Sequence, residues 1–145
     1  VTASSSTTKI EKPTAQKILK GELKIGDKIR LKNIYFKSSY STIIPSSIPT
    51  LKEIAAILVK RKNIYFTIQG HVCCTHDIYD AIDRKTSQRN LSYSRAKFIY
   101  TYLLQQGVEK HRMKFIGLKR KFPLGGDPKL DRRVEILITH IGKEI

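Results

Sequence analysis

The chain has 145 residues, enough for one domain with a substantial core, and its 40% hydrophobic and 28% charged residues are typical of a globular protein. Its formal net charge of +16, from 28 Lys and Arg against 12 Asp and Glu, predicts an anionic partner. The basic residues are spread along the whole chain, and no zinc-finger spacing, basic-region helix or aromatic RNA-binding motif accompanies them, so nucleic acid is not the expected partner.

Residues 1–22 are rich in Ser, Thr and Lys, and we expect a flexible linker that precedes one domain over residues 23–145. Because the sequence begins at Val1 and carries no signal peptide, we expect a mature chain or an excised fragment of a larger protein. A first strand is predicted to end in "KNIYF", residues 32–36, and the pair Ser46-Ser47 then offers caps for a helix. The apolar residues of that helix form one stripe: Ile48, Leu51, Ile54, Ala55, Leu58 and Val59.

The second half of the chain reads as strand, helix, strand, strand. "NIYFTIQGHV", residues 63–72, is β-branched and aromatic. A helix follows, capped by Thr86, Ser87 or Ser92 and ended by Gly107, and strands are predicted at residues 113–117 and at "RRVEILITHI". A strand, crossover helix and strand form a parallel unit, so we expect an α/β two-layer sandwich with a mixed four-stranded sheet and helices on one face.

The loop after the second strand concentrates reactive side chains. His71, Cys73, Cys74 and His76 have the spacing H-x-C-C-x-H, which raises a zinc site, a disulfide and a catalytic thiol as alternatives. Neighbouring side chains on a strand point to opposite faces, which disfavours zinc, and a disulfide between neighbours would be strained. No third group that would orient a catalytic base can be named, and we expect no metal, cofactor or catalytic site here.

Acidic residues follow at three-residue intervals: Asp77, Asp80 and Asp83. They are either a solvated loop balanced by nearby cations or a site for an ammonium group. Arg95 lies near the start of the next helix, where the helix dipole disfavours cations and backbone N–H groups attract anions. It is either a surface arginine paired with an aspartate or a ligand for a carboxylate, which arginine binds with two parallel hydrogen bonds.

Several motifs follow one another in order over roughly residues 32–141: Gly70-His71, Leu91-Ser92-x-x-Arg95-Ala96, Gly107-Val108, Arg112, Gly117, Pro123 and Asp131-Arg132-Arg133-Val134-Glu135. Together they resemble the C-terminal domain of the outer membrane protein A (OmpA) family, which includes peptidoglycan-associated lipoproteins and the wall-binding part of flagellar motor stators. A longer acidic loop after "GHVCC" is similar to a Bacteroidetes variant of the family.

The resemblance implies a β-α-β-α-β-β fold and non-covalent binding of peptidoglycan in the periplasm of a Gram-negative bacterium, with no catalysis and no cofactor. The expected partners are peptidoglycan and an outer-membrane anchor in the same parent chain or complex, with a homodimer as a further option. In the family, the diaminopimelate of the stem peptide is held by an aspartate after Gly-His and by two arginines, which correspond here to Arg95 and Arg132.

The sequence departs from the family pattern at the aspartate, where Cys73 stands instead. Gln88 takes the place of the asparagine before the helix, and the loop between Cys73 and Gln88 is longer than usual. Asp77, Asp80 and Asp83 are therefore candidates for the missing acid, with Asp83 preferred. Two rival functions follow: a domain of this family that has lost wall binding and acts as a protein interaction module, and, with less support, a basic nucleic-acid-binding domain.

Overall fold

The computed structural model describes residues 15–31, 34–37, 40–72, 80–119 and 133–142. Three helices and four strands occur there, together with two short 3-10 turns. The helices are α1 (Ala15–Lys20), α2 (Ile48–Lys60) and α3 (Leu91–Gln106). The strands are β2 (Lys28–Arg30), β3 (Ile64–Gly70), β4 (Met113–Gly117) and β5 (Val134–Ile141).

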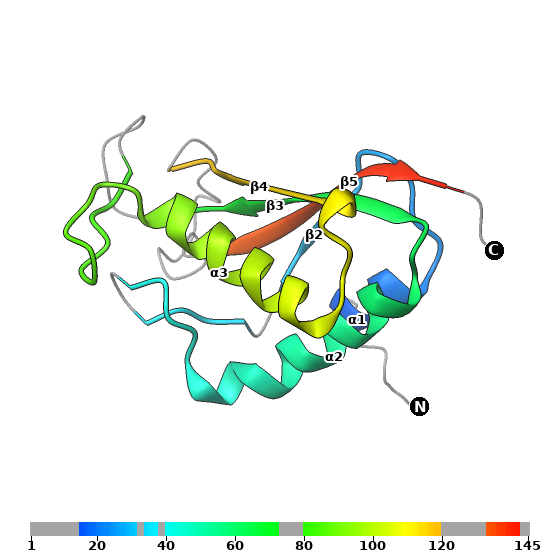
Figure 1. Ribbon diagram of the computed structural model, residues 1–145, viewed down its shortest axis with the longest axis horizontal. Coiled ribbons are helices and arrows are strands. Elements are labelled where there is room, and N and C mark those ends of the chain that lie inside the picture. Colours follow the sequence, from blue (N-terminus) through cyan, green and yellow to red (C-terminus); the bar gives the residue numbers. More distant parts are fainter. Residues whose placement is uncertain (1–14, 32–33, 38–39, 73–79, 120–132, 143–145) are drawn as a thin grey trace, which may run out of the picture.

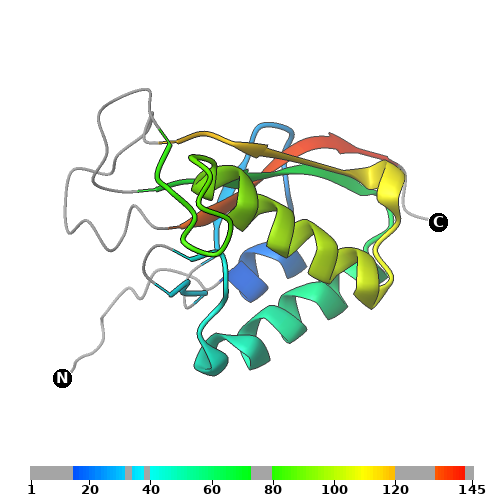
Figure 2. The same ribbon diagram turned by 60° about the vertical axis from the view of Figure 1, so that its left-hand side comes forward.

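The strands form one mixed sheet in the order β2-β5-β3-β4, and the helices lie on one of its faces (Figures 1 and 2). β3 and β4 are parallel, with α3 as the crossover between them, and β5 is antiparallel to both β3 and β2. The predicted two-layer α/β sandwich with a mixed four-stranded sheet is therefore confirmed.

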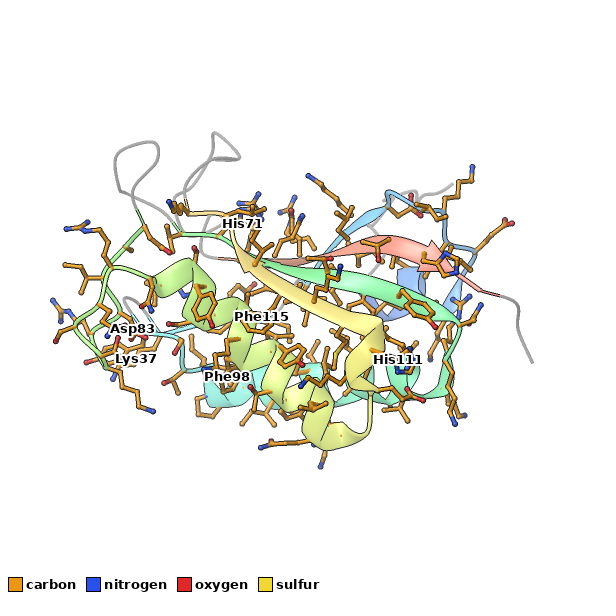
Figure 3. The ribbon with its side chains drawn as sticks, turned by 45° about the horizontal axis from the view of Figure 1, so that its top comes forward. Lys37, His71, Asp83, Phe98, His111 and Phe115 are labelled. Atoms are coloured by element: carbon orange, nitrogen blue, oxygen red, sulfur yellow. The ribbon has the colours of Figure 1, made fainter. Side chains whose placement is uncertain are left out.

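The core fills the space between the helices and the sheet. Each central strand turns alternate side chains toward the helices, as the period of two predicts; Ile64, Phe66 and Ile68 of β3 are buried in this way. The stripe of α2 supplies Leu51, Ile54, Ala55 and Leu58, whereas Ile48, which we also placed in the stripe, is 43% exposed. On β4, Phe115 packs against rings of α3, with centroids 5.3 Å from Tyr93 and 4.7 Å from Tyr100 (Figure 3).

Three local predictions differ from the structure. The first strand spans Lys28–Arg30, and Phe36 instead forms an isolated bridge with Ile43. The hydroxyl of Ser47 does not cap α2, because its Oγ accepts a hydrogen bond from the Tyr35 N–H at 3.0 Å. Residues 15–20, which we placed in a linker, form α1, and Leu19 is fully buried in the core.

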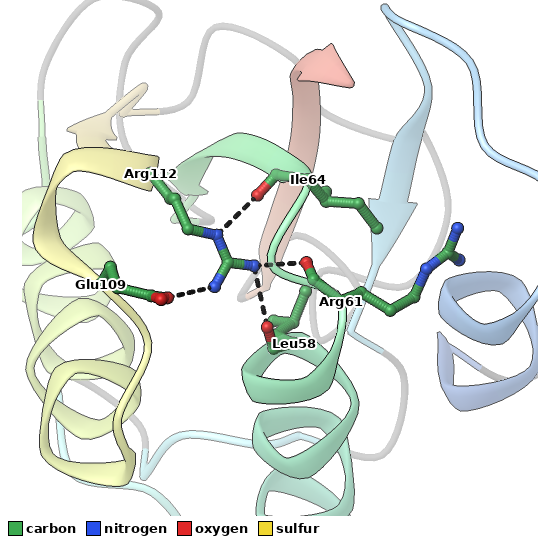
Figure 4. A network of polar contacts seen from close by, with 5 residues as sticks. All are labelled: Leu58, Arg61, Ile64, Glu109 and Arg112. Carbon is green, nitrogen blue, oxygen red and sulfur yellow. Dashed lines mark hydrogen bonds and ion pairs between the residues drawn. The ribbon is translucent and has the colours of Figure 1, made fainter. Parts of the chain in front are cut away.

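Arg112 ties several elements together from inside the domain. Its buried guanidinium donates to the backbone carbonyls of Leu58 and Arg61 at the end of α2 and of Ile64 at the start of β3, at 2.6–3.0 Å (Figure 4). It also donates to Glu109 Oε1 at 2.6 Å, and this hydrogen bond lowers the pKa of Glu109. Arg112 is therefore a structural residue that satisfies the carbonyls left over where α2 ends.

Candidate functional site

Helix α3 begins directly against the ends of β3 and β4. A Cβ atom on Gly70 would lie 2.0 Å from the Ser92 carbonyl oxygen, and one on Gly117 would lie 2.4 Å from the Tyr93 nitrogen. Such distances are far below van der Waals contact, so only glycine allows this approach. The two glycines thereby place the first turn of α3, with Ser92 and Arg95, at the ends of these two parallel strands.

Asp80 caps this helix from twelve residues upstream. Its Oδ1 accepts the Ser92 N–H at 2.8 Å and the Ala81 N–H at 2.8 Å, and its Oδ2 accepts the Ser92 hydroxyl at 2.6 Å. The carboxylate is buried and lies where the helix dipole favours negative charge. The predicted caps Thr86, Ser87 and Ser92 are wrong, because α3 begins at Leu91 directly after Asn90 and the Ser92 N–H donates to Asp80.

Arg95 is fully buried one helical turn after Ser92. Its guanidinium donates to the backbone carbonyls of Tyr40 at 3.1 Å, His71 at 3.4 Å and Lys37 at 3.5 Å, and it lies 5.2 Å from the centre of the Phe36 ring. The residue therefore lies where α3, the end of β3 and the backbone of Lys37 and Tyr40 meet. The last two hydrogen bonds are at the long limit for such contacts.

Asp83 and Gln88 form the base of a short hairpin before α3. The Asp83 N–H donates to the Gln88 carbonyl at 2.8 Å, and the Asp83 carbonyl accepts the Ser87 N–H at 2.7 Å. The buried Asp83 carboxylate accepts the Lys85 N–H through Oδ1 at 3.0 Å, and Gln88 is exposed. Asp80 and Asp83 thus both belong to the loop that leads into α3, but Asp80 is occupied by capping.

A second polar cluster lies where β3 and β5 run side by side. The buried His71 Nε2 is 3.4 Å from Glu135 Oε1, and Arg133 Nε donates to Glu135 Oε2 at 3.1 Å. The contact with His71, and then that with Arg133, lower the pKa of Glu135 from 4.5 to about 2 although burial raises it. All three residues lie in the family motifs, but the cluster was not predicted from the sequence. It forms because the antiparallel pairing of β3 and β5 brings His71 next to Arg133 and Glu135.

The remaining predicted site residues, Cys73, Asp77 and Arg132, lie outside the described residues, as do Cys74 and His76. Within the described ranges, no group of three or more His, Cys, Asp or Glu side chains is arranged to hold a metal ion. The role of Asp80 was also missed. The sequence offers only a weak signal for this capping role: an aspartate lies in the loop before a helix that has no good cap of its own. The signal is weak because the number of residues between such an aspartate and the helix can vary.

The assignment of the fold to a family rests on the sequence match over residues 35–135, which covers both parallel strands, α2 and α3. The chain belongs to the OmpA family. A comparison with proteins of curated function found no match. In the part of this OmpA-family chain that the structure describes, no helix is long and apolar enough to cross a membrane.

Solved structures share the fold at low sequence identity. The periplasmic domain of Helicobacter pylori MotB (residues 78–256) is 18% identical with a TM-score of 0.65, covering 82% of this chain and 79% of its own. The cell wall anchor of the type VI secretion system (T6SS) from Pseudomonas aeruginosa is 23% identical with a TM-score of 0.60, covering 78% and 79%. The peptidoglycan-associated lipoprotein from Burkholderia pseudomallei is 24% identical with a TM-score of 0.56, covering 73% and 88%.

Proposed function

We propose that this OmpA-family domain binds peptidoglycan non-covalently, in the periplasm, and anchors an outer-membrane protein or complex to the cell wall without catalysing a reaction. The observation that carries the proposal is the position of the Arg95 guanidinium on α3, next to the end of β3 and to the carbonyls of Lys37 and Tyr40. A cell wall anchor and a peptidoglycan-associated lipoprotein with the same fold support it.

In this proposal, Arg95 and Arg132 hold the carboxylate of diaminopimelate. The 3.4 Å and 3.5 Å hydrogen bonds of Arg95 to neutral carbonyls are weak, and replacing them with two shorter parallel bonds to an anionic carboxylate would be favourable. The first amides of α3 are less suited to hold the carboxylate as well, since the Ser92 N–H donates to Asp80 and the Leu91 N–H to the Ala81 carbonyl.

Asp83 remains the proposed acceptor for the ammonium group. Asp80 has three hydrogen bonds to its carboxylate already, whereas among the described residues Asp83 has one, to Oδ1. Because Asp83 is buried, its carboxylate can meet the ammonium group only if the ligand reaches inward or the hairpin moves slightly. We also propose that Asp77 and Cys73 contact the same ligand. Gln88, which is exposed, is proposed to lie next to it.

The test is cosedimentation with purified sacculi. Arg95→Ala should abolish binding, and Asp83→Asn should weaken it, while circular dichroism shows both variants folded. Because Arg95 is buried, its replacement by alanine could also affect folding. Arg95→Lys therefore provides a second variant, which keeps the positive charge but loses the planar guanidinium. Undiminished sacculus binding by folded Arg95→Ala and Arg95→Lys proteins would refute the site.

The capping role of Asp80 favours a second candidate, a domain that has lost wall binding and serves as a protein interaction module. A family aspartate is replaced by Cys73, and Asp80 is committed to the helix. This candidate predicts that the unmodified domain does not sediment with sacculi at physiological salt. Sedimentation that a diaminopimelate-containing peptide competes away would exclude it.

A further inference from the structure

The hairpin between Asp83 and Gln88 presents a pair of adjacent cations to solvent. Arg84 and Lys85 are both exposed at its tip, and Arg89 is exposed just after it. Among the salt bridges between described residues, none involves these three side chains; Arg89 instead donates from Nη1 to the Asp80 carbonyl at 3.3 Å. Neighbouring like charges repel, so a bound anion would stabilise this tip.

The hairpin is fixed in shape by hydrogen bonds within its own backbone. The Asp83 carbonyl accepts the N–H groups of Thr86 and Ser87, and Ser87 adopts a left-handed φ of 60°. The only carboxylate of the hairpin, that of Asp83, is buried and bonded to the Lys85 N–H rather than turned toward the cationic side chains. The positive tip is therefore held in place and is not neutralised from within the hairpin.

The base of the hairpin is joined to the first turn of α3. The Leu91 N–H donates to the Ala81 carbonyl at 3.0 Å, and Asp80 holds Ser92, which precedes Arg95 by three residues on the same side of the helix. In Figure 1 the hairpin projects beyond the N-terminal end of α3, and in Figure 2, where that side comes forward, it lies in front of the start of the helix. The hairpin that carries the two cations is thus joined to the part of α3 that carries Arg95.

We propose that Arg84 and Lys85 bind a second carboxylate of the wall stem peptide, next to the diaminopimelate, so that the domain prefers peptides whose neighbouring carboxylate is not amidated. This inference rests on the proposed function and adds a ligand specificity to it. Exposed ion pairs contribute little individually and are screened by salt, so the preference is modest and disappears at high ionic strength.

The experiment compares two synthetic stem peptides that both contain intact diaminopimelate, one with a neighbouring carboxylate and one with that carboxylate amidated. Affinities are measured by calorimetry at low salt for the unmodified domain, for Arg84→Gln/Lys85→Gln, and for Lys52→Gln/Lys60→Gln on α2. The control pair removes the same charge from exposed positions of a different element. The unmodified domain and the control should prefer the carboxylate peptide about five-fold, and the hairpin variant should bind both peptides equally.

Three results would overturn the inference, and they differ in whether the proposed function is overturned as well. If the hairpin variant kept the full preference for the carboxylate peptide, or if the control lost this preference as much as the hairpin variant, the tip would not bind the carboxylate. In either case the proposed function would stand. Failure of the unmodified domain to bind either peptide would overturn the proposed function together with this specificity.

Discussion

Asp80 holds Ser92 through both oxygens of its carboxylate, one accepting the backbone N–H at 2.8 Å and the other the hydroxyl at 2.6 Å. The same Ser92 hydroxyl accepts the Lys119 N–H at 3.0 Å. One buried acid therefore connects the loop before α3, the helix itself and the chain that leaves β4. The start of α3 is fixed before any ligand arrives, and Arg95 is positioned with it.

Asp80→Ala should lower the free energy of unfolding by about 1–3 kcal/mol, because a buried N–H and hydroxyl lose their acceptors and the helix loses its cap. Urea denaturation gives this value. Asp27→Ala is the matched control, since Asp27 also accepts a backbone N–H, that of Lys24, but in an exposed turn. Equal losses for the two variants would show that Asp80 contributes no more than a surface turn residue.

Gly70→Ala should prevent α3 from packing on β3, because the added Cβ would meet the Ser92 carbonyl oxygen at 2.0 Å. That oxygen belongs to helix backbone, which cannot move aside locally, so we expect a loss of about 3 kcal/mol or more, above the usual cost of overpacking. Gly142→Ala is the control, since its Cβ would be 3.7 Å from the nearest atom. Thermal unfolding of both variants decides the point, and a Gly70→Ala protein as stable as Gly142→Ala would contradict the packing.

Most of the fold could be predicted because it depends on local patterns. The stripe of α2, the alternation along β3 and Gly107, which ends α3 with a φ of 108°, are properties of consecutive residues. The first strand was predicted to extend to Phe36 because this residue is apolar. In the structure its ring instead contacts Phe98, and its backbone forms an isolated bridge with Ile43. Helix α1 was missed because a short segment forms there through tertiary packing of Leu19.

The site was harder to predict because its contacts join residues far apart in sequence. Arg95 was selected as a candidate ligand residue, and that role stays a prediction, but its carbonyl partners Lys37 and Tyr40, 58 and 55 residues away, could not be named from the sequence. Asp80 was selected as a ligand candidate and is a cap. An acid near a helix start gives the same sequence signal in both roles, and the choice between them depends on which hydrogen bonds the fold completes.

Arg112→Met should lower the free energy of unfolding by about 3 kcal/mol or more, because the carbonyls of Leu58, Arg61 and Ile64 each lose the guanidinium as a donor. Arg112→Lys should recover only part of this loss, since an ammonium cannot reproduce the fork. Lys110→Met, at an exposed position of the same 3-10 turn, is the control and should change stability by less than about 0.5 kcal/mol. If chemical denaturation gave the same loss of unfolding free energy for Lys110→Met and Arg112→Met, this role of Arg112 would be contradicted.

Glu135 should make the stability of the domain depend on acid pH. Its pKa is about 2 in the folded protein, against 4.5 normally, so the unfolded chain takes up the proton first. The stabilisation is complete above about pH 5 and is lost as pH falls toward 2; its upper limit is about 3 kcal/mol, since the His71 contact is long at 3.4 Å. Urea unfolding should show Glu135→Gln less stable than the unmodified domain at pH 7, and this difference should shrink markedly at pH 2.5, close to the folded pKa of about 2. Glu53→Gln, on the exposed side of α2, controls for loss of a surface carboxylate, and a Glu135→Gln difference that is the same at both pH values would contradict the shift.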